Sequence, residues 1–137
     1  MESKYDREPL RTKLRASFSY VAFWAEKQAQ KKETLILSEH FPEIISAARC
    51  LSAVVSGNNP GRAFRVGGVA NRDRILLFSA LVTELGAMPL DDPNRCDPQL
   101  RTALRRIEEF TEIEGYNFGS CKYYFRTESE TSPKTGP

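Results

Sequence analysis

The chain has 137 residues, of which 40% are hydrophobic and 28% charged, and its formal net charge is only +2. This length suits one domain that buries about two thirds of its unfolded surface, so folding needs no metal or disulfide. The apolar share excludes a wholly disordered chain, and the near-neutral charge excludes a histone-like polycation.

The N-terminal segment and the cysteines indicate where the protein works. Residues 1–9 mix both charge signs and contain no apolar core of the kind that a secretory signal needs. The most apolar stretch, residues 75–85, is far shorter than the roughly 18 apolar residues of a membrane span. Cys50, Cys96 and Cys121 are far apart, so no disulfide framework is expected. These features predict a flexible N-terminal segment over residues 1–9, a cytoplasmic location and no membrane partner.

The first predicted helix covers residues 10–33. Apolar side chains recur there at steps of three or four and share one helix face: Leu10, Leu14, Phe18, Val21, Ala25 and Ala29. Residues 17–24 are rich in aromatics and also alternate in the manner of a strand. The Lys, Arg, Gln and Ala content on either side of them favours a helix.

Two more helices are predicted in the middle of the chain. One covers residues 38–56, with Ser38 as its N-cap and Pro42 close to its first turn. The other covers residues 72–85, with Asn71 as its N-cap. A glycine follows each helix and would end it.

The fourth predicted helix has the clearest start signal in the chain. Asp97 is an acidic N-cap candidate, and Pro98 follows at the first helical position. The helix would run to Ile113, and Gly115 would end it. The preceding residues, 88–96, have the composition of a loop.

The remaining segments predict at most a little β-structure. Residues 63–66 alternate between glycines and would form one short strand that pairs with residues 121–125. The alternative for the aromatic-rich stretch 116–125 is a hydrophobic flap over the helices. The predicted fold is therefore mainly α: a compact four-helix domain over residues 10–126, with a disordered tail at 127–137.

The small net charge conceals an uneven distribution. Residues 1–33 carry eight basic and five acidic residues, whereas residues 97–127 carry five of each. The densest basic cluster comprises Arg62, Arg65, Arg72 and Arg74. Arginines beside glycine-rich backbone at a helix N-terminus can bind phosphate, which makes this arginine cluster a candidate phosphate or nucleic-acid site. The stretch lacks a Walker or dinucleotide motif, and arginines paired with nearby acids on a solvated loop are the more ordinary outcome.

Few residues suit catalysis. His40 is the only histidine and is expected at the surface near a helix start. Cys96 follows Arg95 and precedes a helix N-terminus, two features that favour a thiolate, so it is the candidate reactive thiol. An inert loop cysteine is the plainer interpretation. One histidine and scattered cysteines predict no zinc site, and no cofactor motif is present. The sequence therefore predicts a non-enzymatic protein with no cofactor and no metal.

Aromatic residues provide the remaining signal. Most of the rings in residues 17–24 and 116–125 suit the core, and a core role is as well supported as an interface. A small four-helix domain cannot easily cover all of them, however, and exposed rings mark protein interfaces. The predicted partner contacts are Tyr20, Phe23, Trp24, Tyr123 and Tyr124. A domain with a basic first helix and a glutamate-rich end to the fourth suits pairing with another protein or a second copy of itself. The sequence thus predicts an adaptor, inhibitor or regulatory subunit, with a nucleic-acid-associated protein as the alternative.

Overall fold

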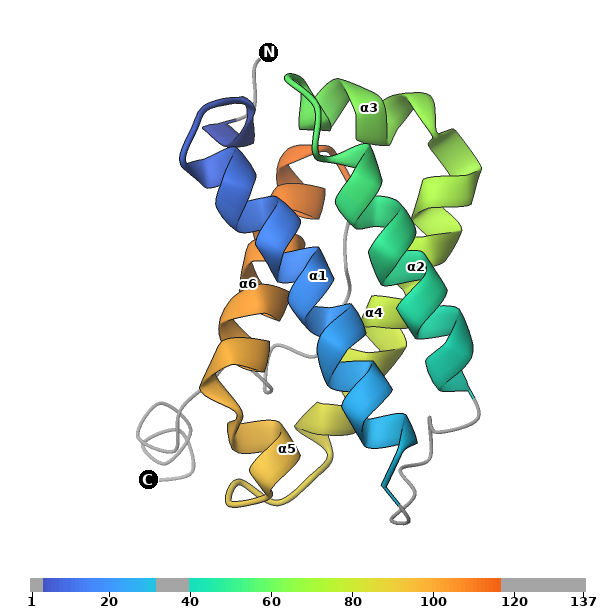
Figure 1. Cartoon of the computed structure of the whole chain (residues 1–137), viewed down its shortest axis with the longest axis vertical. Coiled ribbons are helices and arrows are strands. Elements are labelled where there is room, and N and C mark those ends of the chain that lie inside the picture. The colour runs from blue at the N-terminus through green and yellow to red at the C-terminus, as the bar shows by residue number, and fades with distance from the viewer. Residues whose placement is uncertain (1–3, 32–39, 117–137) are drawn as a thin grey trace, which may run out of the picture.

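The structure, a computed structural model, describes residues 4–31 and 40–116. In chain order these residues form a 3-10 turn and six α-helices: η1 (Lys4–Asp6), α1 (Leu10–Ala29), α2 (Phe41–Val54), α3 (Pro60–Val66), α4 (Gly68–Gly86), α5 (Pro93–Cys96) and α6 (Pro98–Ile113) (Figure 1). No strand occurs in these two ranges. The mainly helical fold class is therefore confirmed, whereas the expected number of helices was too low because α3 and α5 were not predicted.

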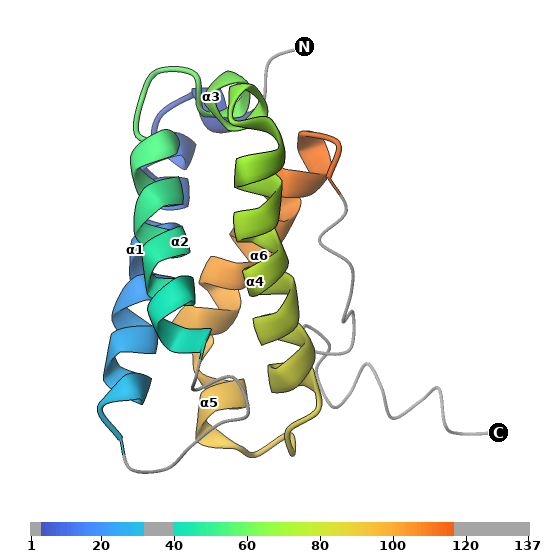
Figure 2. The ribbon, with the colours of Figure 1, turned by 90° about the vertical axis from the view of Figure 1, so that its right-hand side faces the viewer.

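The four long helices, α1, α2, α4 and α6, lie along the long axis of the molecule (Figures 1 and 2). α1 packs against both α2 and α6, and α4 packs against α2. The short helix α3 crosses one end of this bundle, and α5 lies at the other end (Figure 1). α1 therefore contacts two of the other three long helices.

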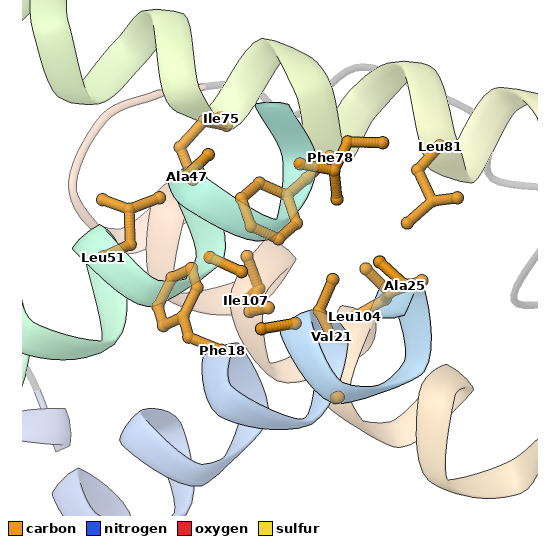
Figure 3. Close-up of a cluster of buried hydrophobic side chains, with 14 of the residues drawn as sticks. Phe18, Val21, Ala25, Ala47, Leu51, Ile75, Phe78, Leu81, Leu104 and Ile107 are labelled. Carbon is orange, nitrogen blue, oxygen red and sulfur yellow. The ribbon is translucent and has the colours of Figure 1, made fainter. Parts of the chain in front are cut away.

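Apolar side chains from all four long helices meet in one core (Figure 3). Phe18 of α1 and Phe78 of α4 pack edge to face, with ring centroids 5.7 Å apart. At the end covered by α3, the Phe110 ring of α6 makes edge-to-face contacts with Tyr5 at 5.7 Å and with Phe64 at 5.5 Å. Each such buried ring contributes about 1.5–3 kcal/mol relative to an exposed one, so these contacts stabilise the helix arrangement.

The N-terminal segment is packed from Lys4 onward, contrary to the flexibility predicted for residues 1–9. Tyr5 is only 2% exposed, its ring contacts Phe110, and its hydroxyl donates a hydrogen bond to Glu109. Residues 1–3 lie outside the described residues. The sequence pattern missed this anchor because both partners of Tyr5 are about a hundred residues away along the chain.

The predicted strand over residues 63–66 is wrong, since these residues belong to α3. Asn59 begins the helix: its side chain accepts a hydrogen bond from the Arg62 N–H at 3.1 Å, and Pro60 occupies the first turn. Phe64 is then buried in the core. Four residues that alternate between apolar and polar fit a short helix as well as a strand, and here the Asn59 cap favours the helix. The proposed partner strand, residues 121–125, lies outside the described residues.

The start of α4 also differs from the prediction. α4 begins at Gly68, so Asn71 lies inside the helix and does not cap it. The Asn71 side chain is buried and donates a hydrogen bond to the Phe64 carbonyl at 3.0 Å, which joins α3 to α4. Gly67 lies directly beneath this amide, where any Cβ would overlap it. Asn71 therefore fixes a corner between two helices.

The other predicted helix ends were partly correct. In α6, Asp97 Oδ1 accepts hydrogen bonds from the backbone N–H groups of Gln99 and Leu100, both at 3.0 Å, which confirms the predicted N-cap. Gly115 follows the helix with a φ of +83°, a conformation that suits glycine. In α2, Pro42 lies in the first turn as predicted, but His40 occupies the N-cap position. The predicted cap, Ser38, lies outside the described residues.

Candidate functional site

The predicted aromatic contacts separate into buried and exposed residues. Trp24 is 3% exposed and packs edge to face on Phe41, with ring centroids 5.9 Å apart. It belongs to the core, so its assignment as a partner contact is corrected: the helical period turns Trp24 inward and the adjacent Phe23 outward. Tyr123 and Tyr124 lie outside the described residues.

Tyr20 and Phe23 lie together on the outer face of α1. Phe23 is 51% exposed, and its ring centroid lies 6.0 Å from that of Tyr20. The Lys27 ammonium is 4.7 Å from the centre of the Phe23 ring, a cation–π contact that keeps this ring near a positive charge. Together these three residues form an exposed basic and aromatic surface on one helix.

The hydroxyl of Tyr20 links α1 to the start of α6. It donates a hydrogen bond to Asp97 Oδ2 at 3.0 Å, while the other oxygen of Asp97 caps α6. Burial and the neighbouring Asp97 carboxylate raise the pKa of Tyr20 to about 12. The hydroxyl therefore stays a neutral donor well above neutral pH, and its hydrogen bond to Asp97 restricts the orientation of the ring. The half-buried ring forms one wall of a depression beside it.

A groove of about 420 Å³ lies on the surface between α1 and α6, beside the Tyr20 ring. Its walls consist largely of small side chains: Ala16 and Ser17 from α1, and Thr102 and Ala103 from α6. The Ser17 hydroxyl already donates to the Lys13 carbonyl at 2.8 Å, so it offers little to a ligand. Arg106 of α6 also lines the groove. We call this depression, together with Tyr20 and Phe23, the α1–α6 groove.

The aromatic residues of this groove, Tyr20 and Phe23, were predicted from the sequence as surface contacts, whereas its other residues were not. A second stripe on α1 follows steps of three and four along its outer face: Lys13, Ala16, Tyr20, Phe23 and Lys27. This spacing was visible in the sequence beside the buried stripe. The α6 wall was not, because a pair of small residues such as Thr102 and Ala103 becomes a depression only once a neighbouring helix is placed beside it.

The four arginines of the predicted phosphate site do not converge. Arg65 forms an ion pair with Glu114, whose side chain is only 2% exposed. The Arg72 guanidinium lies 5.9 Å from the Tyr116 ring centre, and Arg74 donates to Asn71 Oδ1 at 2.5 Å. Arg62 is exposed on α3.

A small pocket of about 150 Å³ does adjoin two of these arginines. Arg65, Arg72 and Glu114 line it, together with Phe64 and Gly68. An anion that entered this pocket would face the Glu114 carboxylate as well as the two guanidinium groups. The pocket is therefore a poor phosphate site as it stands.

The predicted reactive thiol lacks the neighbour that was expected to activate it. Cys96 ends α5, is exposed, and donates its thiol hydrogen to the Leu90 carbonyl at 2.7 Å. Arg95 is buried instead, and its guanidinium donates to the carbonyls of Gly86 at 2.6 Å and Met88 at 2.8 Å. The Arg95 charge therefore stabilises the C-terminal end of α4.

No catalytic or metal-binding cluster is apparent in the part of the chain that the structure describes. His40 is 45% exposed at the start of α2, and its Nδ1 lies 3.9 Å from Glu43 Oε1. Within residues 4–31 and 40–116, no group of three or more His, Cys, Asp or Glu side chains could hold a metal ion. None of the helices in these ranges is long and apolar enough to span a membrane.

Comparison with known proteins adds no relative. No protein-family model matches the chain, and no curated protein or solved structure matches it significantly.

Proposed function

We propose that this protein is a non-enzymatic adaptor, inhibitor or regulatory subunit that binds another protein through the α1–α6 groove. The observation that carries the proposal is a 51% exposed phenylalanine whose ring lies against Tyr20, itself one wall of an open groove with small side chains. Covering the exposed half of the Phe23 ring contributes about 1 kcal/mol, and aromatic anchors of this kind dominate the binding energy of protein interfaces.

The groove supplies the complementary features of such an interface. Its small side chains leave room for an apolar side chain of the partner, and the Tyr20 hydroxyl is already satisfied by Asp97. A partner that covers the Tyr20 ring therefore does not have to supply a hydrogen-bond acceptor for its hydroxyl. A cytoplasmic location belongs to the same proposal and rests on the scattered cysteines.

Affinity capture with two groove variants tests the proposal. Phe23→Ala removes the exposed ring, and Thr102→Trp fills the groove from the exposed side of α6. Leu76→Ala, at another exposed apolar residue on α4, is the matched control. We expect wild type and the control to capture the same protein from native lysate, before and after nuclease treatment, and both groove variants to lose it. Equal capture by all four chains, or none by wild type, would contradict the proposal.

The alternative is a nucleic-acid-associated protein that contacts phosphates through the arginine cluster. It has weaker support, because Arg65 pairs with Glu114 and Arg72 lies against Tyr116. A salt titration of binding separates the two functions. Each phosphate contact makes the slope of log binding constant against log salt concentration steeper by about one unit. A nearly flat plot for binding to DNA or RNA would therefore contradict the alternative.

Self-association is a third arrangement compatible with the proposal, with a second copy as the partner. Light scattering on the purified chain measures its mass directly. If the partner is a second copy, Phe23→Ala and Thr102→Trp should convert a dimer to a monomer.

A further inference from the structure

We propose that the occupant of the α1–α6 groove is an acidic amphipathic helix of the partner, with a bulky apolar side chain as its anchor. This inference rests on the proposed function and adds the chemistry of the partner. Three features of the described residues support it: the spacing of the α1 stripe, the small side chains of the groove, and the charges that remain exposed around it.

The spacing of the stripe suits a helix. Lys13, Ala16, Tyr20, Phe23 and Lys27 follow steps of three and four, the pattern by which packed helices interdigitate. A partner helix that lies along α1 places its own apolar residues, at the same spacing, between Ala16 and Phe23. One of them would enter the space beside Thr102 and Ala103.

The charges that remain exposed along the stripe are basic. Lys13 and Lys27 are exposed at its two ends, and Arg106 lines the groove between them. A partner that approaches this face therefore meets positive charge at three places along about four helical turns. Complementary charge on the partner means aspartate or glutamate at the rim of its apolar stripe.

The acidic residues nearby are already engaged within the chain. Asp97 accepts hydrogen bonds from two backbone N–H groups and from Tyr20. Glu109 accepts from Tyr5 and pairs with Lys4 at 2.9 Å, and the bond from Tyr5 holds the pKa of Glu109 below its usual range. Glu26 of α1 pairs with Arg49 of α2, on the side away from the groove. These carboxylates remain charged but are partly neutralised by their own partners.

A peptide fits this surface better than a nucleic acid does. The walls of the groove are small and largely apolar, and the one aromatic hydroxyl in them is bonded to Asp97. A phosphate backbone would leave this apolar space empty, whereas a leucine, phenylalanine or tryptophan side chain fills it. The basic residues then act as the polar rim around an apolar centre.

Selection from a displayed library of helical peptides, using the full chain as bait, tests this chemistry. We expect the enriched peptides to carry a net negative charge and large apolar residues at i, i+3 or i+4, and i+7. The peptide that binds most tightly is then synthesised, and its affinity is measured by fluorescence anisotropy. Thr102→Trp should weaken it at least about ten-fold because it fills the space that the anchor enters, and Phe23→Ala should do so because it removes the exposed ring against which the peptide packs.

Charge variants test the acidic character separately. Lys13→Glu and Lys27→Glu should each weaken the same peptide about three-fold, since exposed charge pairs are individually weak. Arg15→Glu changes an exposed charge on another face of α1 and should leave the affinity within about two-fold. Circular dichroism of each variant establishes that it is folded.

The outcomes separate the two proposals. Groove-dependent peptides that are neutral or basic would overturn the acidic partner and leave the proposed function standing. Acidic peptides whose binding ignores Thr102→Trp and Phe23→Ala would show attraction by charge alone and overturn the helix in the groove. If no enriched peptide depends on the groove, and affinity capture shows no groove-dependent protein, both proposals fail.

Discussion

Two tyrosine hydroxyls connect distant parts of this chain by the same chemistry but differ in what surrounds them. Tyr5 donates to Glu109 from a buried position at the N-terminus, and Tyr20 donates to Asp97 beside the open groove. Burial is the main cause that raises the pKa of both tyrosines, and the adjacent carboxylate adds to it. The buried pair therefore acts on stability, whereas the half-buried pair orients a ring at the candidate interface.

Replacing Tyr5 with phenylalanine tests the buried pair. Tyr5→Phe should lower the free energy of unfolding at pH 7 by about 1–2 kcal/mol, because Glu109 loses a donor while the ring contact with Phe110 remains. Urea denaturation at several pH values measures this difference. Leu10→Ala, at a half-buried residue outside this pair, provides a comparison whose cost should not change with pH.

The pH dependence of this difference follows from the two pKa shifts. Since the pKa of Glu109 is lowered in the folded state, its contribution is present above the unfolded value of about 4.3 and is lost as the pH falls below it. The pKa of Tyr5 is raised in the folded state, so the wild-type free energy of unfolding falls as the pH rises above the unfolded tyrosine pKa of about 10. Tyr5→Phe lacks this titrating hydroxyl, and its free energy of unfolding should fall less over the same pH range. A difference that stays constant from pH 3 to pH 11 would contradict the Tyr5–Glu109 pairing.

At the scale of the helices, the features that depend on nearby residues were predicted from the sequence, whereas those that depend on contacts between helices were not. The Asp97–Pro98 start of α6 was found because a cap bonds to backbone within three residues of itself. Asn71 was misassigned because its partner is the carbonyl of Phe64, on the helix before. Residues 63–66 were misassigned because a four-residue pattern cannot distinguish a strand from a single helical turn.

The corner between α3 and α4 depends on the absence of a side chain at Gly67. A Cβ there would overlap the buried Asn71 amide and displace it from the Phe64 carbonyl. We expect Gly67→Ala to lower the free energy of unfolding by about 1–3 kcal/mol, because overpacking outweighs the gain in helix propensity. Gly57→Ala, where no atom lies near the added Cβ, should be neutral within about 0.5 kcal/mol in the same urea titration. Equal stability of the two variants would contradict this role for Gly67.

The start of α6 depends on Asp97 in two ways. Asp97→Ala removes both the cap and the acceptor for Tyr20, and should cost about 1–2 kcal/mol of unfolding free energy. Tyr20→Phe removes only the hydroxyl bond and should cost about 0.5–1 kcal/mol in thermal or urea denaturation. Asp97→Asn should recover most of the loss, because asparagine caps as well as aspartate does. If the alanine and asparagine variants are equally unstable, the cap is not the dominant contribution.

On the scale of the whole molecule, several of its acidic residues are held by partners within the chain. Glu26 is paired across α1 and α2, Glu109 ties the N-terminus to α6, and Glu114 ties α6 to α3. The bases on the outer stripe of α1 are exposed, so a chain with a net charge of +2 presents a basic face there. The basic segments are evident in the sequence, but this face is not, because the ion pairs that define it join residues 23 or more positions apart.

The ion pair between Arg65 and Glu114 distinguishes a structural role for the arginine cluster from a binding role. Arg65 bridges α3 to the end of α6, and Glu114 is buried beside Gly61. Arg65→Ala should lower the free energy of unfolding by about 1–2 kcal/mol, because it leaves that carboxylate without its cation; the value is reduced because Arg65 is itself 52% exposed. Arg62→Ala, at an exposed residue of the same helix, should cost less than about 0.5 kcal/mol. The double variant Arg65→Ala with Glu114→Gln should lose less free energy of unfolding than the two single variants lose together, since the two side chains interact. An Arg65 that served only to bind phosphate would show no such coupling in the free protein.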